Sequence, residues 1–176
     1  MAAKMVSFHI PEDLEFLAAV GRVALAHAHL DHMLRLTIKS LAGSSVTEAR
    51  LATAGYGSAE LRDEVKALGK KSLGDGRAFI RLRTHLTQGK MLTRKRNELM
   101  HGICAREIKG DAESDAEMFG ATVLLDEELR TRPLPSNEEL TKLAEDIGSL
   151  VDELDYFRKI NFQMPPIPDR RQPAAG

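Results

Sequence analysis

Residues 77–102 read RAFIRLRTHLTQGKMLTRKRNELMHG. Apolar side chains recur near the end of this stretch at spacings of three and four, which is the period of an amphipathic helix. Gly102 stands where a residue in the left-handed conformation commonly ends a helix. The stretch therefore predicts a helix from about Arg77 to Met100, and the rest of the fold is built around it.

The end of this helix, RNELMH, carries unusual polar chemistry. Arg96 is four residues after Leu92 and three before Leu99, so it falls on the inward apolar stripe. Asn97 and His101 are four apart and share the neighbouring ridge. The three polar side chains can thus line the edge of one groove.

Two helical regions are expected before this helix. Residues 11–13, Pro-Glu-Asp, open the first, because proline and acids are favoured in a first turn, and 43–45 end it. The second is broken by the glycines of 55–57 and resumes from Ser58, a candidate N-cap, to about Leu68. Residues 69–76 are expected to form a loop.

After Gly102 the hydrophobic period changes. Residues 103–108 and 118–125 are expected to form two short strands around a polar loop. Ser136 and Glu139 form a capping-box pattern, and an apolar stripe follows it from Leu140 to Phe157. The last helix is therefore expected to begin at Ser136.

These elements predict a mainly α fold, an up-and-down helical bundle with a small β-hairpin inserted before the last helix. The chain has 176 residues, enough for one domain with a sizeable core, which we assign to residues 1–162. The proline-rich tail, residues 163–176, is expected to be disordered.

Composition excludes several classes of protein. No stretch approaches the roughly 18 apolar residues of a membrane span, and residues 1–10 lack the pattern of a secretory signal. Cys104 is the only cysteine, so it has no partner for an internal disulfide, and it has no evident base that would make it a nucleophile. We expect a cytoplasmic protein. Tryptophan is absent and aromatic residues make up 5%, which argues against aromatic platforms for nucleic-acid bases.

Charge changes sign along the chain. Residues 70–106 contain ten bases and two acids, a local balance of +8, whereas residues 107–155 contain fifteen acids and four bases. Two interpretations remain open: the two regions neutralise each other in the fold, or a basic surface persists around RNELMH and attracts an anion. Arg94 and Lys95 are accordingly either a solvated face or phosphate contacts.

The Arg96-Asn97-x-x-x-His101 pattern near a helix end, followed by glycine, resembles the signature of HEPN domains (higher eukaryotes and prokaryotes nucleotide-binding). The stretch GRVALAHAHLDHMLRLTIKSL, residues 21–41, is also similar to the long first helix of that family, including an acid at Asp31. Together with the hairpin and the final helix, the resemblance spans about residues 12–160.

The resemblance implies a metal-independent endoribonuclease that acts as a homodimer, with two motifs meeting across the subunit interface and no cofactor. Arg96 would hold the phosphate and His101 would transfer protons. Asn97 would orient either His101 or a phosphate oxygen. Arg94, Lys95 and Arg106 are the candidate RNA contacts, and Asp31 is a supporting residue. A defence or toxin–antitoxin-like setting, with an antitoxin or another protein partner, would fit.

The alternative is a non-catalytic HEPN-like dimerisation module that binds a protein or nucleotide partner. Because a buried, unpaired guanidinium is costly, Arg96 would then pair with Asp31, and His101 would cap helix carbonyls. The net charge of −1 and the presence of Glu98 inside the motif favour this alternative.

The first helical region also holds a cluster of histidines, His27, His29 and His32, beside Asp31. In a helix, His27 and Asp31 share one face while the other two share another, so the four side chains do not converge on one ion. No His-Glu-x-x-His spacing occurs. We therefore expect no metal site, and instead partly buried histidines on a packing helix.

Overall fold

The expected helical class is confirmed by the computed structural model, which describes residues 6–108, 119–126, 128 and 130–162. Five helices are described, and they are α1 (Leu14–Ala42), α2 (Val46–Ala52), α3 (Ser58–Leu73), α4 (Arg77–Met100) and α6 (Asn137–Phe162). Four strands form one sheet, and they are β1 (Val6–Phe8), β2 (Ile103–Ile108), β3 (Phe119–Leu125) and β4 (Thr131–Pro133).

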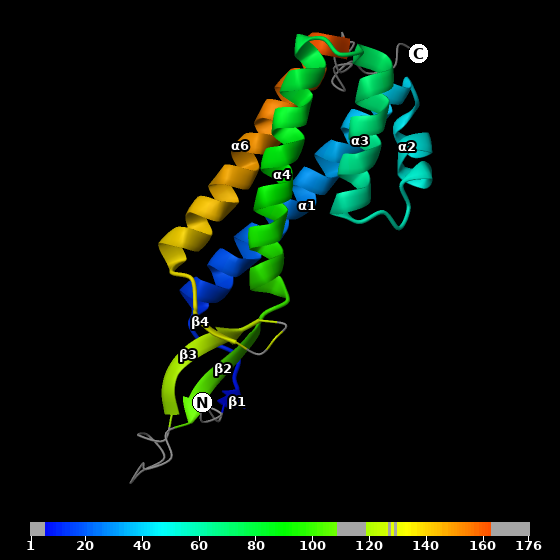
Figure 1. Ribbon diagram of the computed structural model, residues 1–176. Helices are drawn as coiled ribbons and strands as arrows, with labels where there is room; N and C mark the ends of the chain where they lie inside the picture. The colour runs from blue at the N-terminus through cyan, green and yellow to red at the C-terminus, as the bar shows by residue number, and fades with distance from the viewer. Residues whose placement is uncertain (1–5, 109–118, 127, 129, 163–176) are drawn as a thin grey trace, which may run out of the picture.

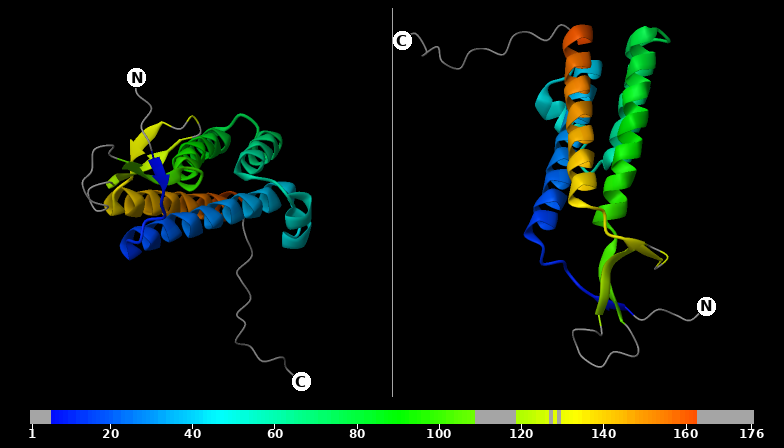
Figure 2. Two further views of the ribbon diagram at one scale, coloured as in Figure 1. Left: turned by 90° about the horizontal axis from the view of Figure 1, so that it is seen from below. Right: turned by 90° about the vertical axis from the view of Figure 1, so that its left-hand side faces the viewer.

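The three long helices α1, α4 and α6 lie along one another, and the sheet sits at one end of them (Figure 1). Helix α4 runs in the opposite direction to α1 and α6, and Figure 2 shows α1 beside α6 and α4 beside α6. Side chains of these helices that are completely buried in the core include Val23, Leu30, Leu82, Ile147, Leu150 and Phe157. Burial of apolar side chains on this scale is the main stabilising term of the bundle.

The helix ends follow local capping chemistry. Asp13 caps α1, since its Oδ1 accepts hydrogen bonds from the backbone of Glu15 and Phe16. Pro11 and Glu12 therefore precede the helix. They do not form its first turn, which is contrary to our expectation. Gly43 ends α1 with a φ of 65°. At α6, Ser136 and Glu139 form the predicted capping box, with bonds of 2.8 and 3.1 Å.

Helix α3 is longer than expected. The predicted loop began at Gly69, but the helix continues through it to Leu73. Gly69 lies against α4, and a Cβ atom there would come within 2.7 Å of Leu82 Cδ2. The glycine permits close helix packing instead of breaking the helix. Ser58 is the first helical residue, and Gly57 is the N-cap.

The sheet contains the predicted hairpin and two further strands. Strand β2 pairs antiparallel with β3, with Cys104 opposite Leu124, and β3 follows the expected range except at Met118, which lies outside the described residues. Strand β1 adds to β2 and β4 adds to β3, giving the order β1-β2-β3-β4. The predicted loop of 109–117 and the tail of 163–176 also lie outside the described residues.

Gly102 joins the end of α4 to β2, and its role differs from the one expected. Its φ is not positive, so the left-handed prediction is wrong. A Cβ at this position would lie 2.5 Å from Leu124 Cγ, so only glycine fits beside this β3 side chain. This close contact fixes the sheet directly against the RNELMH segment.

Candidate functional site

Arg96 is half-buried on the last turn of α4. Its Nη1 donates a hydrogen bond to Asn97 Oδ1 at 3.0 Å, and its buried Nε has no hydrogen-bond partner. Among the described residues, no carboxylate forms an ion pair with it, so the pairing with Asp31 is not formed. The guanidinium is therefore held at one corner and left without a counter-charge.

His101 is exposed and closes α4, with its backbone N–H donating to the Asn97 carbonyl at 2.9 Å. Its imidazole makes no hydrogen bond within the part of the chain that the structure describes, so it does not cap helix carbonyls. Both ring nitrogens are free to exchange protons with a bound molecule. Asn97 is half-buried and connects the two, by its side chain to Arg96 and by its carbonyl to His101.

A polar network behind Arg96 joins three helices. Thr93 Oγ1, on α4, donates to Gly89 O at 2.8 Å and accepts from Arg62 Nη1, on α3, at 3.0 Å. His27 Nε2, on α1, lies 3.2 Å from the same hydroxyl. Because the Thr93 proton is already used, His27 must donate, which assigns the proton to Nε2. His27 Nδ1 then faces Asp31 Oδ2 across 3.7 Å without a proton between them.

The network affects how its members titrate. Burial lowers the pKa of His27; the nearby Asp31 opposes this effect, while the positive charges of Arg96 and Arg62 add to it. Burial likewise lowers the pKa of Arg62, against the attraction of Asp31 and Asp63. His27 is therefore neutral at neutral pH, and Asp31 Oδ1 is buried without a hydrogen-bond partner.

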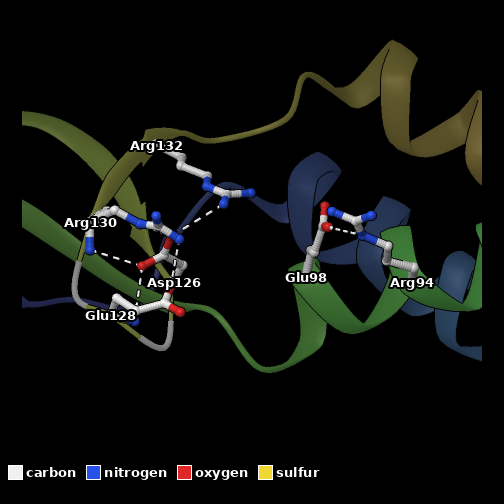
Figure 3. A network of polar contacts seen from close by, with 6 residues as sticks. All are labelled: Arg94, Glu98, Asp126, Glu128, Arg130 and Arg132. Atoms are coloured by element: carbon white, nitrogen blue, oxygen red, sulfur yellow. Dashed lines mark hydrogen bonds and ion pairs between the residues drawn. The ribbon is translucent and has the colours of Figure 1, made fainter.

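The other predicted contact residues are spread over the surface. Arg94 is exposed and pairs with Glu98 at 2.9 Å, as Figure 3 shows. Lys95 is exposed at the rim of a hollow between α4 and the start of α6. Arg106 lies on β2 and lines a separate hollow with His9 and residues of the α1 entry. Of these three residues, only Arg94 and Lys95 lie on α4 close to Arg96.

The histidines of α1 differ from the expected partial burial. His27 is buried, whereas His29 and His32 are exposed on the other side of α1. Across residues 6–108, 119–126, 128 and 130–162, no group of three or more His, Cys, Asp or Glu side chains is placed to hold a metal ion. Cys104 is half-buried, and burial raises the pKa of its thiol.

In the described part of the chain, the acids that follow α4 form no ion pair with its lysines and arginines. Helix α4 has seven bases and one acid, and among the described residues the only base of α4 in an ion pair is Arg94, which pairs with Glu98 of the same helix. Asp126, by contrast, is bound by Arg130 and Arg132 of its own segment (Figure 3). Within the described residues, six of the seven bases of α4 therefore form no ion pair.

The sequence did not identify Arg62 and Thr93 as site residues. Thr93 carried a usable signal, because it is three residues before Arg96 and so lies on the same side of α4. Arg62 carried none, since its contact with Thr93 joins positions 31 residues apart.

Comparison of the chain with protein-family models, with curated proteins and with solved structures found no match. Within the described residues, no helix is both long and apolar enough to cross a membrane. What the site does is therefore inferred from its own chemistry.

Proposed function

We propose that this protein is a HEPN-like, metal-independent endoribonuclease that acts as a homodimer, with the RNELMH segments of two chains forming one site. The observation that carries the proposal is Arg96, a half-buried arginine without a carboxylate partner among the described residues, five positions before the exposed His101. Because no carboxylate among the described residues neutralises the Arg96 guanidinium, a phosphate group can take that place.

Energetics support a binding role for Arg96. Withdrawing a guanidinium from water is costly unless an anion compensates it. Asn97 fixes Nη1 and Nε is buried, so Nη2 is the guanidinium nitrogen that this conformation leaves for a phosphate oxygen. Such a donor can stabilise the negative charge that grows on a phosphate in the transition state.

His101 supplies the proton chemistry. The 2′-oxygen of a ribose bonds to the adjacent phosphorus, and the bond from phosphorus to the 5′-oxygen breaks. One histidine takes the proton of the 2′-hydroxyl, and a second gives a proton to the leaving 5′-oxygen. Each chain offers one such histidine at this site, so a symmetric dimer supplies both. The products are a 2′,3′-cyclic phosphate and a 5′-hydroxyl, and no metal takes part.

The surface around His101 is suited to a second chain. Met100 and Ile103 flank it and are 38% and 44% exposed, respectively. Apolar side chains exposed next to a polar site are typical of interfaces. The proposal also places the enzyme in the cytoplasm. It assigns the enzyme a defence or toxin–antitoxin-like role with a protein partner.

A second candidate is a non-catalytic HEPN-like dimerisation module that binds a protein or nucleotide. Glu98 favours it, because its exposed carboxylate lies one turn from His101 and would repel a phosphate chain. The ion pair with Arg94 offsets that charge only partly, since both side chains are solvated.

Cleavage of a structured RNA in the presence of EDTA tests the proposal. The His101→Ala protein should cleave about 10²- to 10⁴-fold more slowly than the wild type, the range expected for loss of a positioned proton-transfer group. His32→Ala is the matched control, because His32 is equally exposed but lies on α1 away from the motif, and it should cleave normally. Equal rates for the His101→Ala and wild-type proteins, or no cleavage by either, would rule out the enzyme.

A further inference from the structure

A basic groove runs between α3 and α4, apart from the RNELMH segment. It has a volume of about 210 Å³, and its charged lining is Arg62 and Lys66 from α3 and Arg83 and Lys90 from α4. Asp63 is the single acid among the lining residues. The groove therefore carries a net positive charge over a small area.

Three of these bases have no internal partner. Lys66, Arg83 and Lys90 are exposed, and no described carboxylate forms an ion pair with them. On α6 the situation is different, because Lys142 pairs with Asp146 at 3.2 Å and Lys159 pairs with Asp155 at 2.6 Å. The charges of the groove are available to an external anion.

The groove and the motif lie along one face of α4. Residues 83, 87, 90, 94, 97 and 101 are spaced by four and three, so they share one face of the helix. From Lys90 to His101 the helix rises about 17 Å, which corresponds to about five nucleotides of a stacked strand. Arg62 connects the two regions, since it lines the groove and also donates to Thr93, one turn before Asn97.

We propose that this groove binds the phosphate backbone of single-stranded RNA and leads the strand to His101. The lining residues include no aromatic side chain, so the groove cannot stack bases and must read charge instead of sequence. The arginine side chains offer forked donors to phosphate oxygens, and the lysine side chains offer single positive charges. The Thr87 hydroxyl is a further hydrogen-bond donor in the groove. The inference extends the proposed ribonuclease but is tested by binding alone.

The experiment measures binding of a fluorescent single-stranded RNA by anisotropy over a series of salt concentrations. All proteins carry His101→Ala, so that no cleavage interferes. Lys66→Gln/Lys90→Gln removes two charges from the groove, and Lys142→Gln/Lys159→Gln removes two from α6 as the matched control. Both double variants change exposed lysines, and circular dichroism checks that they fold.

The slope of log K against log salt is negative, and for the groove variant it should be shallower by about 1.4, the value for two lost phosphate contacts on a single strand. If the groove variant and its parent bind RNA equally at 1 M salt, this difference in slope makes the variant bind about 25-fold more weakly at 0.1 M salt. The control should keep the slope of the parent. Equal binding by the two double variants would overturn the assignment, as would displacement of the RNA by polyglutamate at equal charge concentration.

The outcome is separable from that of the ribonuclease proposal. Weaker binding by the groove variant supports the groove even if the wild-type protein cleaves no RNA. Conversely, if the wild-type protein cleaves RNA and the groove variant binds like its control, the groove assignment is wrong and the cleavage site stands. In an active background, the groove variant should raise KM and leave kcat unchanged.

Discussion

Two arginines of this protein lie among packed helices in different states. Arg158 is 2% exposed and is held by Asp155 at 3.2 Å and by Ser40 at 3.2 Å. Arg96 is half-buried and has only Asn97. If Arg158 serves the fold and Arg96 serves a ligand, the two should respond in opposite ways to the loss of charge.

Replacing Arg96 with methionine should leave the free energy of unfolding unchanged within about 0.5 kcal/mol, or raise it, because a poorly compensated charge is removed. The same change at Arg158 should cost about 1–3 kcal/mol, since it removes the hydrogen bonds of a buried guanidinium to Ser40 and Asp155, although Asp155 keeps its ion pair with Lys159. Urea unfolding at neutral pH measures both. A loss at Arg96 as large as that at Arg158 would make Arg96 a structural residue.

His27 should make the fold sensitive to acid. Burial holds its pKa below the value of 6.5 that applies in the unfolded chain. Below about pH 6.5 the unfolded state therefore binds a proton that the folded state does not, and stability falls until the pH reaches the lowered pKa. The slope for one such histidine is at most about 1.4 kcal/mol for each pH unit.

Urea unfolding at several pH values between 5 and 7 tests this expectation. His27→Gln should flatten the dependence, whereas His32→Gln, on the exposed side of α1, should not. Part of the slope should remain, because burial also lowers the pKa of His85 despite its contact with Glu153. The same slope in the His27→Gln and wild-type proteins would contradict a neutral, buried His27.

At the scale of elements, the packing of α3 on α4 depends on Gly69. A Cβ at this position would meet Leu82, which is fully buried and cannot move aside. Gly69→Ala should therefore lower the free energy of unfolding by about 1–3 kcal/mol. Gly21→Ala, in α1 with no atom within 4 Å of the new Cβ, should raise it by about 0.5–1 kcal/mol. Thermal unfolding distinguishes the two, and a gain at both positions would refute the close packing.

The same elements show what the sequence could predict. The bounds of α4 and the caps of α6 follow from local period and capping residues, and both predictions are confirmed. Strands β1 and β4 have three residues each, too few to show a period, so they were missed. Gly69 does not break its helix, and Gly102 follows the end of its helix without the predicted left-handed conformation, because tight tertiary contacts use the missing Cβ at both positions.

The candidate site divides in a similar way. The phases of Arg96, Asn97 and His101 were predicted from their spacing on one helix; Arg96 and Asn97 are half-buried on α4, and His101 is exposed just after its end. The contacts of Thr93 with Arg62 and His27 join residues 31 and 66 positions apart, so only the packing of the helices reveals them. The charge segregation was visible in the sequence, but whether it cancels depended on which acids reach α4.

At the scale of the whole molecule, the composite site requires two chains. We expect a particle of about twice the 19.4 kDa chain mass in sedimentation equilibrium. Met100→Lys/Ile103→Lys should shift it toward the monomer, because charges would replace the exposed apolar side chains next to His101. Ile160→Lys, at the end of α6 remote from the sheet, should not (Figure 1). A wild-type protein that is strictly monomeric would remove the composite site.

The central claim is that the RNELMH segment cleaves RNA by proton transfer at the 2′-hydroxyl, and the chemical ends of the products test it most directly. Wild-type protein is incubated with an end-labelled RNA in EDTA, and the fragments are analysed by mass spectrometry. The account predicts fragments that end in a 2′,3′-cyclic phosphate and begin with a 5′-hydroxyl. Fragments with a 3′-hydroxyl and a 5′-phosphate, or intact RNA, would contradict it.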